Sequence, residues 1–335
     1  MAITGPSSYV PTINEFLSHW QACNTALPPL TPFLVRRPAT NTTVARAQFL
    51  AIRDALVAQQ GVVQGCLTEQ QIARGAINLQ KTVLLARFNL FLARLDAYFR
   101  NTDFYAARPY APSGSDGQEN FTRPLVAAIK LWEKINAGPA PTGVTLPLLL
   151  VPGNVAVGDF ASAVSALQFA YAAEQDKEQN VTIARAKRNR IQDDSYEVMK
   201  AYRENLPGSL VANFPELVET LPRLTPLPGH TPEPVNASAI FVAPNSAKVV
   251  YDESTDGMLQ RYELRGNVGD EYSDEDAVVI ASHGPGEPLE FIVPFGLNQP
   301  GAEVALKVYV ILTTGNEAGS AVLLVERPLA LPLAA

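Results

Sequence analysis

The stretch Pro222-Arg-Leu-Thr-Pro226-Leu-Pro228-Gly-His-Thr-Pro232-Glu-Pro234 divides this sequence into two parts with different hydrophobic periodicities. Before it, apolar residues recur at spacings of three and four through long segments, which is the pattern of amphipathic helices. After it, apolar and polar residues alternate in short segments, which is the pattern of β-strands. We therefore predict a multi-domain α plus β protein: a long-helix bundle at 1–222, a Pro-rich linker at 223–234 and a β-sandwich at 235–335.

Five segments of the first part have helical spacing: 12–27, 43–101, 122–138, 160–205 and 209–220. Thr12 and Glu15 form a capping-box pattern at the start of the first segment. The second segment contains no proline, and its glycines leave two alternatives, one long helix with a break at 61–67 or two consecutive helices. Short connections between such helices favour an antiparallel bundle.

The segment 138–158 is rich in proline and glycine and contains no charged residue. Pro147 and Pro152 exclude a continuous helix, and Pro152-Gly-Asn154 is typical of a turn between two extended arms. One interpretation is a loop or hairpin that folds over the end of the bundle, and the other is an apolar surface that inserts into a neighbouring subunit. The apolar run is too short and too interrupted to span a bilayer.

Charge is scarce and unevenly distributed along the chain. Charged residues make up 18 % of the 335 residues and hydrophobic residues 47 %, so the long helices have few charges for their outer faces. Either the surface is rich in neutral polar residues, or other subunits cover part of it. Residues 235–335 carry a formal −9 (14 acidic, 5 basic), against +2 for residues 1–234. The acidic part therefore has the charge to dock on the basic part, within one chain or between chains.

The most basic segment, Arg185-Ala-Lys-Arg-Asn-Arg190, lies in the predicted helix 160–205. It has no interleaved aromatic residues of the kind that stack on nucleic-acid bases. The pI near 5.1 also argues against a nucleic-acid partner. We interpret this segment as a solvated helix face or as a dock for the acidic C-terminal part.

The second part contains seven short alternating segments: 239–242, 248–251, 260–265, 277–282, 290–293, 305–312 and 321–326. This is the strand number and spacing of an immunoglobulin-like sandwich. The part resembles a fibronectin type III domain at Pro232/Pro234, Tyr251, Tyr262-Glu-Leu-Arg265, Leu297-Asn-Gln-Pro300-Gly301 and the hairpin Asn316–Ser320. That family usually has Trp at the position of Tyr251 and Tyr at that of Val304, so another immunoglobulin-like sandwich is the alternative. The resemblance implies a domain that binds a partner or acts as a spacer. For the helical part, no resemblance to a known family is identified.

The sequence contains no evident catalytic or cofactor motif. Its three histidines, His19, His230 and His283, form no HExxH pair, and G-x-S-x-G, Walker and dinucleotide patterns are absent. We interpret His19 as a surface or packing residue, and place His230 in the linker and His283 in a turn. We therefore predict no catalytic, cofactor-binding or metal-binding residues, and no cofactor.

Three features leave alternatives open. Cys23 and Cys66 are interpreted as free thiols inside helices, with a disulfide between helices as the alternative. The acidic run Asp270–Asp276 is interpreted as a solvated loop, with a calcium site as the alternative because several oxygens could converge there. Carboxylates on separate helices, such as Asp96 and Asp193, cannot be paired from sequence.

The N-terminal residues contain no basic segment followed by an apolar one, so no signal peptide is visible. No run of 18 apolar residues occurs, and we predict no membrane span. A cytoplasmic location is expected, with a non-standard export route as the alternative.

These observations together favour a non-enzymatic structural or assembly protein. In this hypothesis the helical bundle self-associates, and the acidic sandwich is displayed or docks on a neighbouring subunit. The partner is another copy of the chain or another protein. The alternative is a binding module whose sandwich loops recognise a polysaccharide or a protein, and a third hypothesis is an enzyme that uses carboxylates within the bundle.

Overall fold

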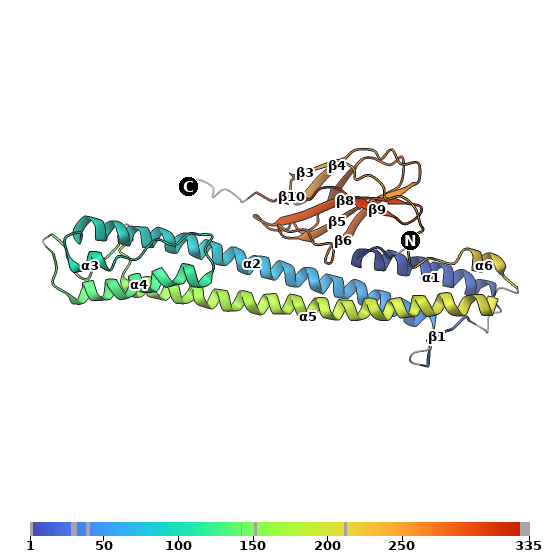
Figure 1. Cartoon of the computed structure of the whole chain (residues 1–335), viewed down its shortest axis with the longest axis horizontal. Helices are drawn as coiled ribbons and strands as arrows, with labels where there is room; N and C mark the ends of the chain where they lie inside the picture. Colours follow the sequence, from blue (N-terminus) through green and yellow to red (C-terminus); the bar gives the residue numbers. More distant parts are fainter. Residues whose placement is uncertain are drawn as a thin grey trace. The chain divides into compact units, whose positions relative to one another are not determined.

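The computed structural model describes residues 3–27, 32–37, 41–141, 143–150, 153–210 and 213–328. Long helices come first and antiparallel strands follow, as predicted (Figure 1). The chain forms two compact units, Met1–Thr68 with Val181–Ala335, and Glu69–Asn180. The second unit is therefore inserted into the first in sequence, and the predicted linker 223–234 lies within the first unit.

The second unit is built from the C-terminal part of α2 (Arg46–Tyr98), α3 (Asp103–Ala106), α4 (Gln118–Ala137) and the N-terminal part of α5 (Val157–Leu210). Helix α2 has no break at 61–67, so the single-helix alternative is confirmed. Apolar side chains at helical spacing form the core of this unit, in which the rings of Phe91 and Trp132 stack with centroids 5.2 Å apart.

The Pro/Gly-rich segment predicted at 138–158 packs on this core. Leu148 and Leu150 are buried, and Leu150 forms an antiparallel bridge with Val155. The indole N–H of Trp132 donates to the carbonyl oxygen of Leu148 (3.0 Å). The described residues of the segment therefore pack on the core of their own unit, and these leucines are used within the chain.

The helical part of the first unit consists of a 3₁₀ turn (Pro6–Ser8), α1 (Tyr9–Ala26), a hairpin of β1 (Val35–Arg37) and β2 (Thr42–Val44), the remaining parts of α2 and α5, and α6 (Pro215–Glu219). Aromatic side chains gather in its core, where Trp20 of α1 and Tyr202 of α5 have ring centroids 5.0 Å apart. This contact joins segments that lie far apart in the sequence.

The predicted capping box at Thr12 and Glu15 is wrong. Helix α1 begins at Tyr9, because the preceding 3₁₀ turn continues directly into it. The hydroxyl oxygen of Ser8 accepts the backbone N–H of Thr4 (2.9 Å) and of Gly5 (3.1 Å). Thr12 is therefore buried inside the helix instead of capping it.

Within residues 213–328 of the first unit, eight strands form two antiparallel sheets. The three-stranded sheet contains β3 (Ala237–Val242), β4 (Ser246–Tyr251) and β7 (Glu290–Val293). The other sheet has the order β10-β8-β5-β6, with β9 paired to β8; its strands are β5 (Leu259–Val268), β6 (Val278–His283), β8 (Glu303–Leu312), β9 (Glu317–Gly319) and β10 (Leu323–Glu326). Each predicted strand overlaps one of the eight, and β9 falls in the predicted hairpin, so the count of seven is not confirmed.

One apolar core joins the inner faces of the two sheets, but their outer faces differ. Alternation along β5 sends Tyr262 and Leu264 into the core and places Glu263 and Arg265 on the outer face, where both are nevertheless buried. Tyr309 of β8, opposite Glu263, is also buried on this face, whereas Leu324 of β10 is exposed. The outer face of the three-stranded sheet is exposed.

Candidate functional site

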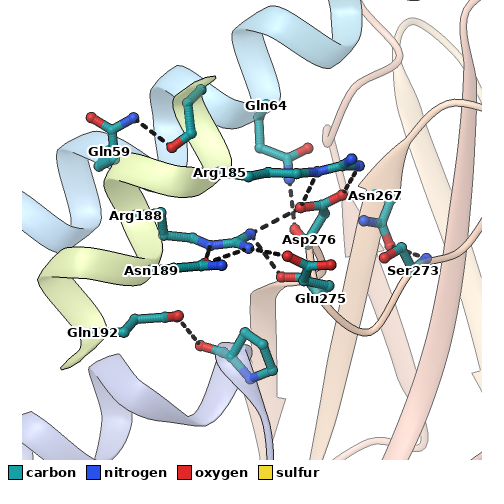
Figure 2. A network of polar contacts seen from close by, with 12 residues as sticks. Gln59, Gln64, Arg185, Arg188, Asn189, Gln192, Asn267, Ser273, Glu275 and Asp276 are labelled. Carbon is teal, nitrogen blue, oxygen red and sulfur yellow. Dashed lines mark hydrogen bonds and ion pairs between the residues drawn. The ribbon is translucent and has the colours of Figure 1, made fainter. Parts of the chain in front are cut away.

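Two arginines of α5 bind the loop between β5 and β6 (Figure 2). Nη1 of Arg188 donates to Oδ1 of Asp276 (2.9 Å) and to the carbonyl oxygen of Glu275 (2.7 Å), and Nη2 donates to Oε1 of Glu275 (3.0 Å). Nε of Arg185 donates to Oδ1 of Asp276 (3.1 Å), and its Nη2 donates to Oδ2. Both carboxylate oxygens of Asp276 therefore accept from a guanidinium group.

Gln64 of α2 binds the same loop. Its Nε2 donates to the carbonyl oxygen of Asp276 (2.8 Å), and its Oε1 accepts the backbone N–H of Val268 (3.4 Å). The loop is also braced internally, because the N–H of Ser273 donates to Oδ1 of Asn267 (3.2 Å). Polar side chains of two helices thus hold one loop of the sandwich.

The central ion pair is almost fully withdrawn from water. Arg188 is 2 % exposed and Asp276 is 3 % exposed, so each charge relies on the other and on nearby hydrogen bonds in place of hydration. The hydrogen bond to Asp276 raises the pKa of Arg185, against the opposing effect of its partial burial. The predicted dock for the acidic part is therefore present within one chain, at Arg185 and Arg188.

A second charged network covers the outer face of the five-stranded sheet. Arg265 donates from Nε to Oε2 of Glu263 (3.0 Å) and from Nη1 to Oε1 of Glu317 (2.9 Å). Its guanidinium lies 4.1 Å from the centroid of the Tyr309 ring, and the Tyr309 hydroxyl donates to Asp274. Burial opposes the charge of Arg265, but the two glutamates outweigh burial and raise its pKa. Burial and the bond to Asp274 raise the pKa of Tyr309 to about 12.

A cavity of about 570 Å³ borders this second network. Its walls include residues 3–5 near the N-terminus, residues 316–319 at β9 and the side chains of Arg265, Asp274 and Tyr309. These charged groups already pair with one another, so the cavity offers little unsatisfied charge to a ligand. We assign it to the packing of the N-terminal segment on the sheet.

His19 is a packing residue, as predicted. Its Nε2–H donates to the carbonyl oxygen of Leu217 (2.7 Å), which leaves Nδ1 to accept the hydroxyl of Tyr202 (2.8 Å). The Tyr202 oxygen lies 3.4 Å from Sγ of Cys23. Burial lowers the pKa of His19, against the effect of the Leu217 bond, and burial raises the pKa of both Cys23 and Tyr202. The cluster ties α1, α5 and α6 together and holds its thiol in the protonated form.

The other two histidines have separate partners. His230 pairs with Asp256 and lowers the pKa of that carboxyl group. The ring of His283 stacks on Phe291 with centroids 4.2 Å apart. The structure therefore gives each of the three histidines its own surroundings.

The remaining sequence candidates are also placed. Cys23 and Cys66 are free thiols, the first buried and the second half-buried. Asp96 lies in the second unit, 3.4 Å from Arg108, whereas Asp193 belongs to the first.

The interpretation of Asp270–Asp276 as a solvated loop is wrong at its C-terminal end. Asp276 is buried because two arginines of α5 neutralise it, and Asp274 accepts the hydroxyl of Tyr309. Within the described ranges, no group of three or more His, Cys, Asp or Glu side chains is placed to hold a metal ion. Three of the carboxylates that suggested a calcium site, Asp274, Glu275 and Asp276, therefore serve other contacts.

Comparisons with known proteins find only distant likenesses. No protein-family model matches the chain, and no curated protein does. A solved fibronectin type III-like protein from Clostridium thermocellum is 15 % identical, the match covering 31 % of this chain and 100 % of that chain with a TM-score of 0.24. A human fourth FNIII domain is 24 % identical, covering 32 % and 88 % with a TM-score of 0.26. Pectate lyase PelI from Erwinia chrysanthemi, solved with tetragalacturonic acid, is 12 % identical, covering 28 % of each chain with a TM-score of 0.23.

The matches to fibronectin domains fall on the C-terminal sheets and are consistent with the predicted resemblance. With TM-scores this low, the likenesses carry no argument about what this chain does. Across the part of the chain that the structure describes, no helix combines the length and the apolar run needed to cross a bilayer.

Proposed function

We propose that this chain is a non-enzymatic structural protein that associates with copies of itself through exposed apolar faces. The observation that carries the proposal is the outer face of the three-stranded sheet, on which the large apolar side chains of Ile240, Ile292 and Val250 are exposed to solvent. Exposed large apolar side chains that gather on one face of a fold mark interaction sites.

The strand register defines this face. Ile240, Lys248 and Ile292 form one row across β3, β4 and β7, and Val250 lies beside Glu290 in the next row. Ile240 is 61 % exposed, Ile292 58 % and Val250 44 %. Lys248 and Glu290 form an ion pair of 2.7 Å, so the face has no net charge inside a region of formal charge −9. Such a face suits contact with another protein surface.

The attachment of the sandwich supports the same proposal. Arg188, Asp276 and Gln64 fasten the loop between β5 and β6 to two helices. Glu263, Arg265 and Tyr309 are buried on the outer face of the five-stranded sheet. The sandwich is thus bound through one face while the other is left free for a partner. The charged side chains of Arg265, Glu263 and their neighbours already pair with one another. This pairing supports the non-enzymatic part of the proposal.

Size-exclusion chromatography with light scattering tests the proposal on the full chain. We expect a mass above the 36.1 kDa of one copy, rising between about 1 and 100 µM, the range in which interfaces of moderate affinity dissociate. Replacing Ile240 and Ile292 together with Glu should reduce the mass at a given concentration, whereas Gln299→Glu, an exposed loop change, should not.

A clean monomer throughout that range would overturn the proposal. The exposed face of β3, β4 and β7 favours a second candidate in that case, a binding module that recognises a different protein. The same double variant would then separate recognition from assembly, since it would lose the partner without changing the mass.

A further inference from the structure

Helix α2 carries two apolar stripes on opposite faces within the second unit. One is buried in the core of the unit and includes Ile77, Leu84, Phe88, Phe91 and Leu95. The other recurs at alternating intervals of three and four residues, at Glu69, Ile72, Ala76, Leu79, Val83, Ala86, Leu90, Ala93 and Ala97. Leu79 follows Ile77 by two residues, which is about 200° around a helix, so the two stripes face opposite ways.

Most of the second stripe faces solvent although it is almost entirely apolar; Leu90 is the member that is partly buried and packs against the core of the unit. Ile72 is 55 % exposed, Leu79 68 % and Val83 43 %. The only charged member is Glu69, at one end of the stripe. A solvated helix face normally carries polar and charged residues. The stripe therefore has the composition of a buried surface in an exposed position.

We infer that this stripe is a helix-packing interface and that its occupant is the same stripe of a second copy of this chain. The inference rests on the proposed function, because it takes self-association as given and names a second surface for it, besides the outer face of β3, β4 and β7. Alternating intervals of three and four residues repeat every 3.5 residues on average, the spacing at which two α-helices stay in contact along their length. Neither a strand nor a loop presents a matching pattern, so the partner surface is a helix.

Self-complementarity identifies the partner helix as another α2. The partner needs large apolar side chains at the same intervals, and in an in-register pair Ile72, Leu79 and Val83 each meet the same residue of the other copy, with alanines such as Ala76 and Ala86 in the layers between them. A partner must also be nearly free of charge over the same length, about 42 Å for residues 69–97 at 1.5 Å per residue. Helix α2 of a second copy meets both conditions.

The residues beside the stripe are compatible with this pairing. In a parallel pair, Arg87 and Arg94 on one flank face the positions of Thr82 and Asn89 on the other copy, so no arginine meets an arginine. The stripe and its flanks supply about 16 residues per copy, fewer than the 20–30 of a standard interface. We therefore expect an association that is reversible in the micromolar range.

A single charge on the stripe tests the inference in the full-length protein. Leu79→Glu places a carboxylate in the centre of the seam, where it would lose its water without gaining a partner. Asn78→Glu adds the same charge one residue earlier, on an exposed position about 100° away from the stripe. Both positions are exposed, so circular dichroism and thermal unfolding should match the wild type, and sedimentation velocity then measures association alone.

We expect Leu79→Glu to raise the dissociation constant at least tenfold and Asn78→Glu to change it less than about twofold. An associating wild type together with an unchanged Leu79→Glu would overturn the inference and leave the proposed function standing. Equal weakening by both variants would also overturn it, because the effect would follow charge and not the stripe. A wild type that is monomeric throughout would remove the proposed function and this inference together.

Discussion

Replacing Asp276 with Asn should loosen the contact between the sandwich and α5. The change keeps the shape of the side chain and one acceptor oxygen but removes the charge that Arg188 and Arg185 share. Arg188 would then stay buried with the backbone and the more exposed carboxylate of Glu275 as its remaining partners in the loop. Removing one partner of a buried ion pair costs about 3–5 kcal/mol. Because Glu275 still helps, we expect about 3 kcal/mol, near the lower end.

Hydrogen–deuterium exchange of the full chain measures this loss locally. About 3 kcal/mol corresponds to roughly 150-fold in the opening equilibrium, and therefore to exchange faster by up to that factor in peptides from the β5–β6 loop and from the part of α5 around Arg188. Peptides from α4, which belongs to the second unit, provide an internal reference and should not change.

Two further variants make this prediction refutable. Glu271→Gln removes the same charge from an exposed position of the same loop and should cost less than about 0.5 kcal/mol. Arg188→Met combined with Asp276→Leu removes both charges and should cost less than Asp276→Asn alone, because no unpaired charge is left. Equal exchange rates in Asp276→Asn and Glu271→Gln would refute the reasoning. So would a double variant whose loss of stability equals the sum of the losses in Arg188→Met and Asp276→Leu measured separately.

Other predictions concern single groups. Burial lowers the pKa of His19 below its unfolded value of 6.5, so its contribution to stability is present above about pH 6.5 and is lost as the pH falls through the folded pKa. Thermal unfolding should therefore show a smaller drop in stability between pH 7.5 and 5 for His19→Gln than for the wild type, and equal drops would contradict this. Burial raises the pKa of Cys23, so a thiol reagent should modify it about 100-fold more slowly than the half-buried Cys66 in single-thiol variants; similar rates would count against the buried cluster. Gly319→Ala would place its new Cβ 2.8 Å from the ring of Tyr309 and should cost about 1–3 kcal/mol in urea unfolding; unchanged stability would show that the ring moves freely.

The division into helices and strands could be predicted because periodicity is a local property. Residues 43–101 lack proline and repeat at helical spacing, and the structure forms one helix, α2, across most of them. The strands were found in the same way, because alternation marks one face as apolar. The short β9 was missed because its three residues, Glu317–Gly319, contain no alternating apolar pattern.

The contacts that build the candidate site could not be derived in the same way. The sequence indicates a basic segment that is either solvated or a dock for the acidic C-terminal part, but Arg188 and Asp276 are 88 residues apart and nothing local selects that pair. In the structure, Glu263 and Arg265 lie on the outer face of β5, where charged residues are usually solvated. Both are buried instead, and only the structure shows it.

The insertion of residues 69–180 into the first unit sets the order in which a newly synthesised chain can fold. Cys23 of α1 packs beside Tyr202, 179 residues later, whereas the second unit is complete once Asn180 has been added. At 5–20 residues per second, the apolar face of α1 waits about 10–40 s for its partner after it leaves the ribosome. During that time α1 is a substrate for chaperones, and a translation pause shortly after Asn180 would prolong its exposure without delaying the second unit.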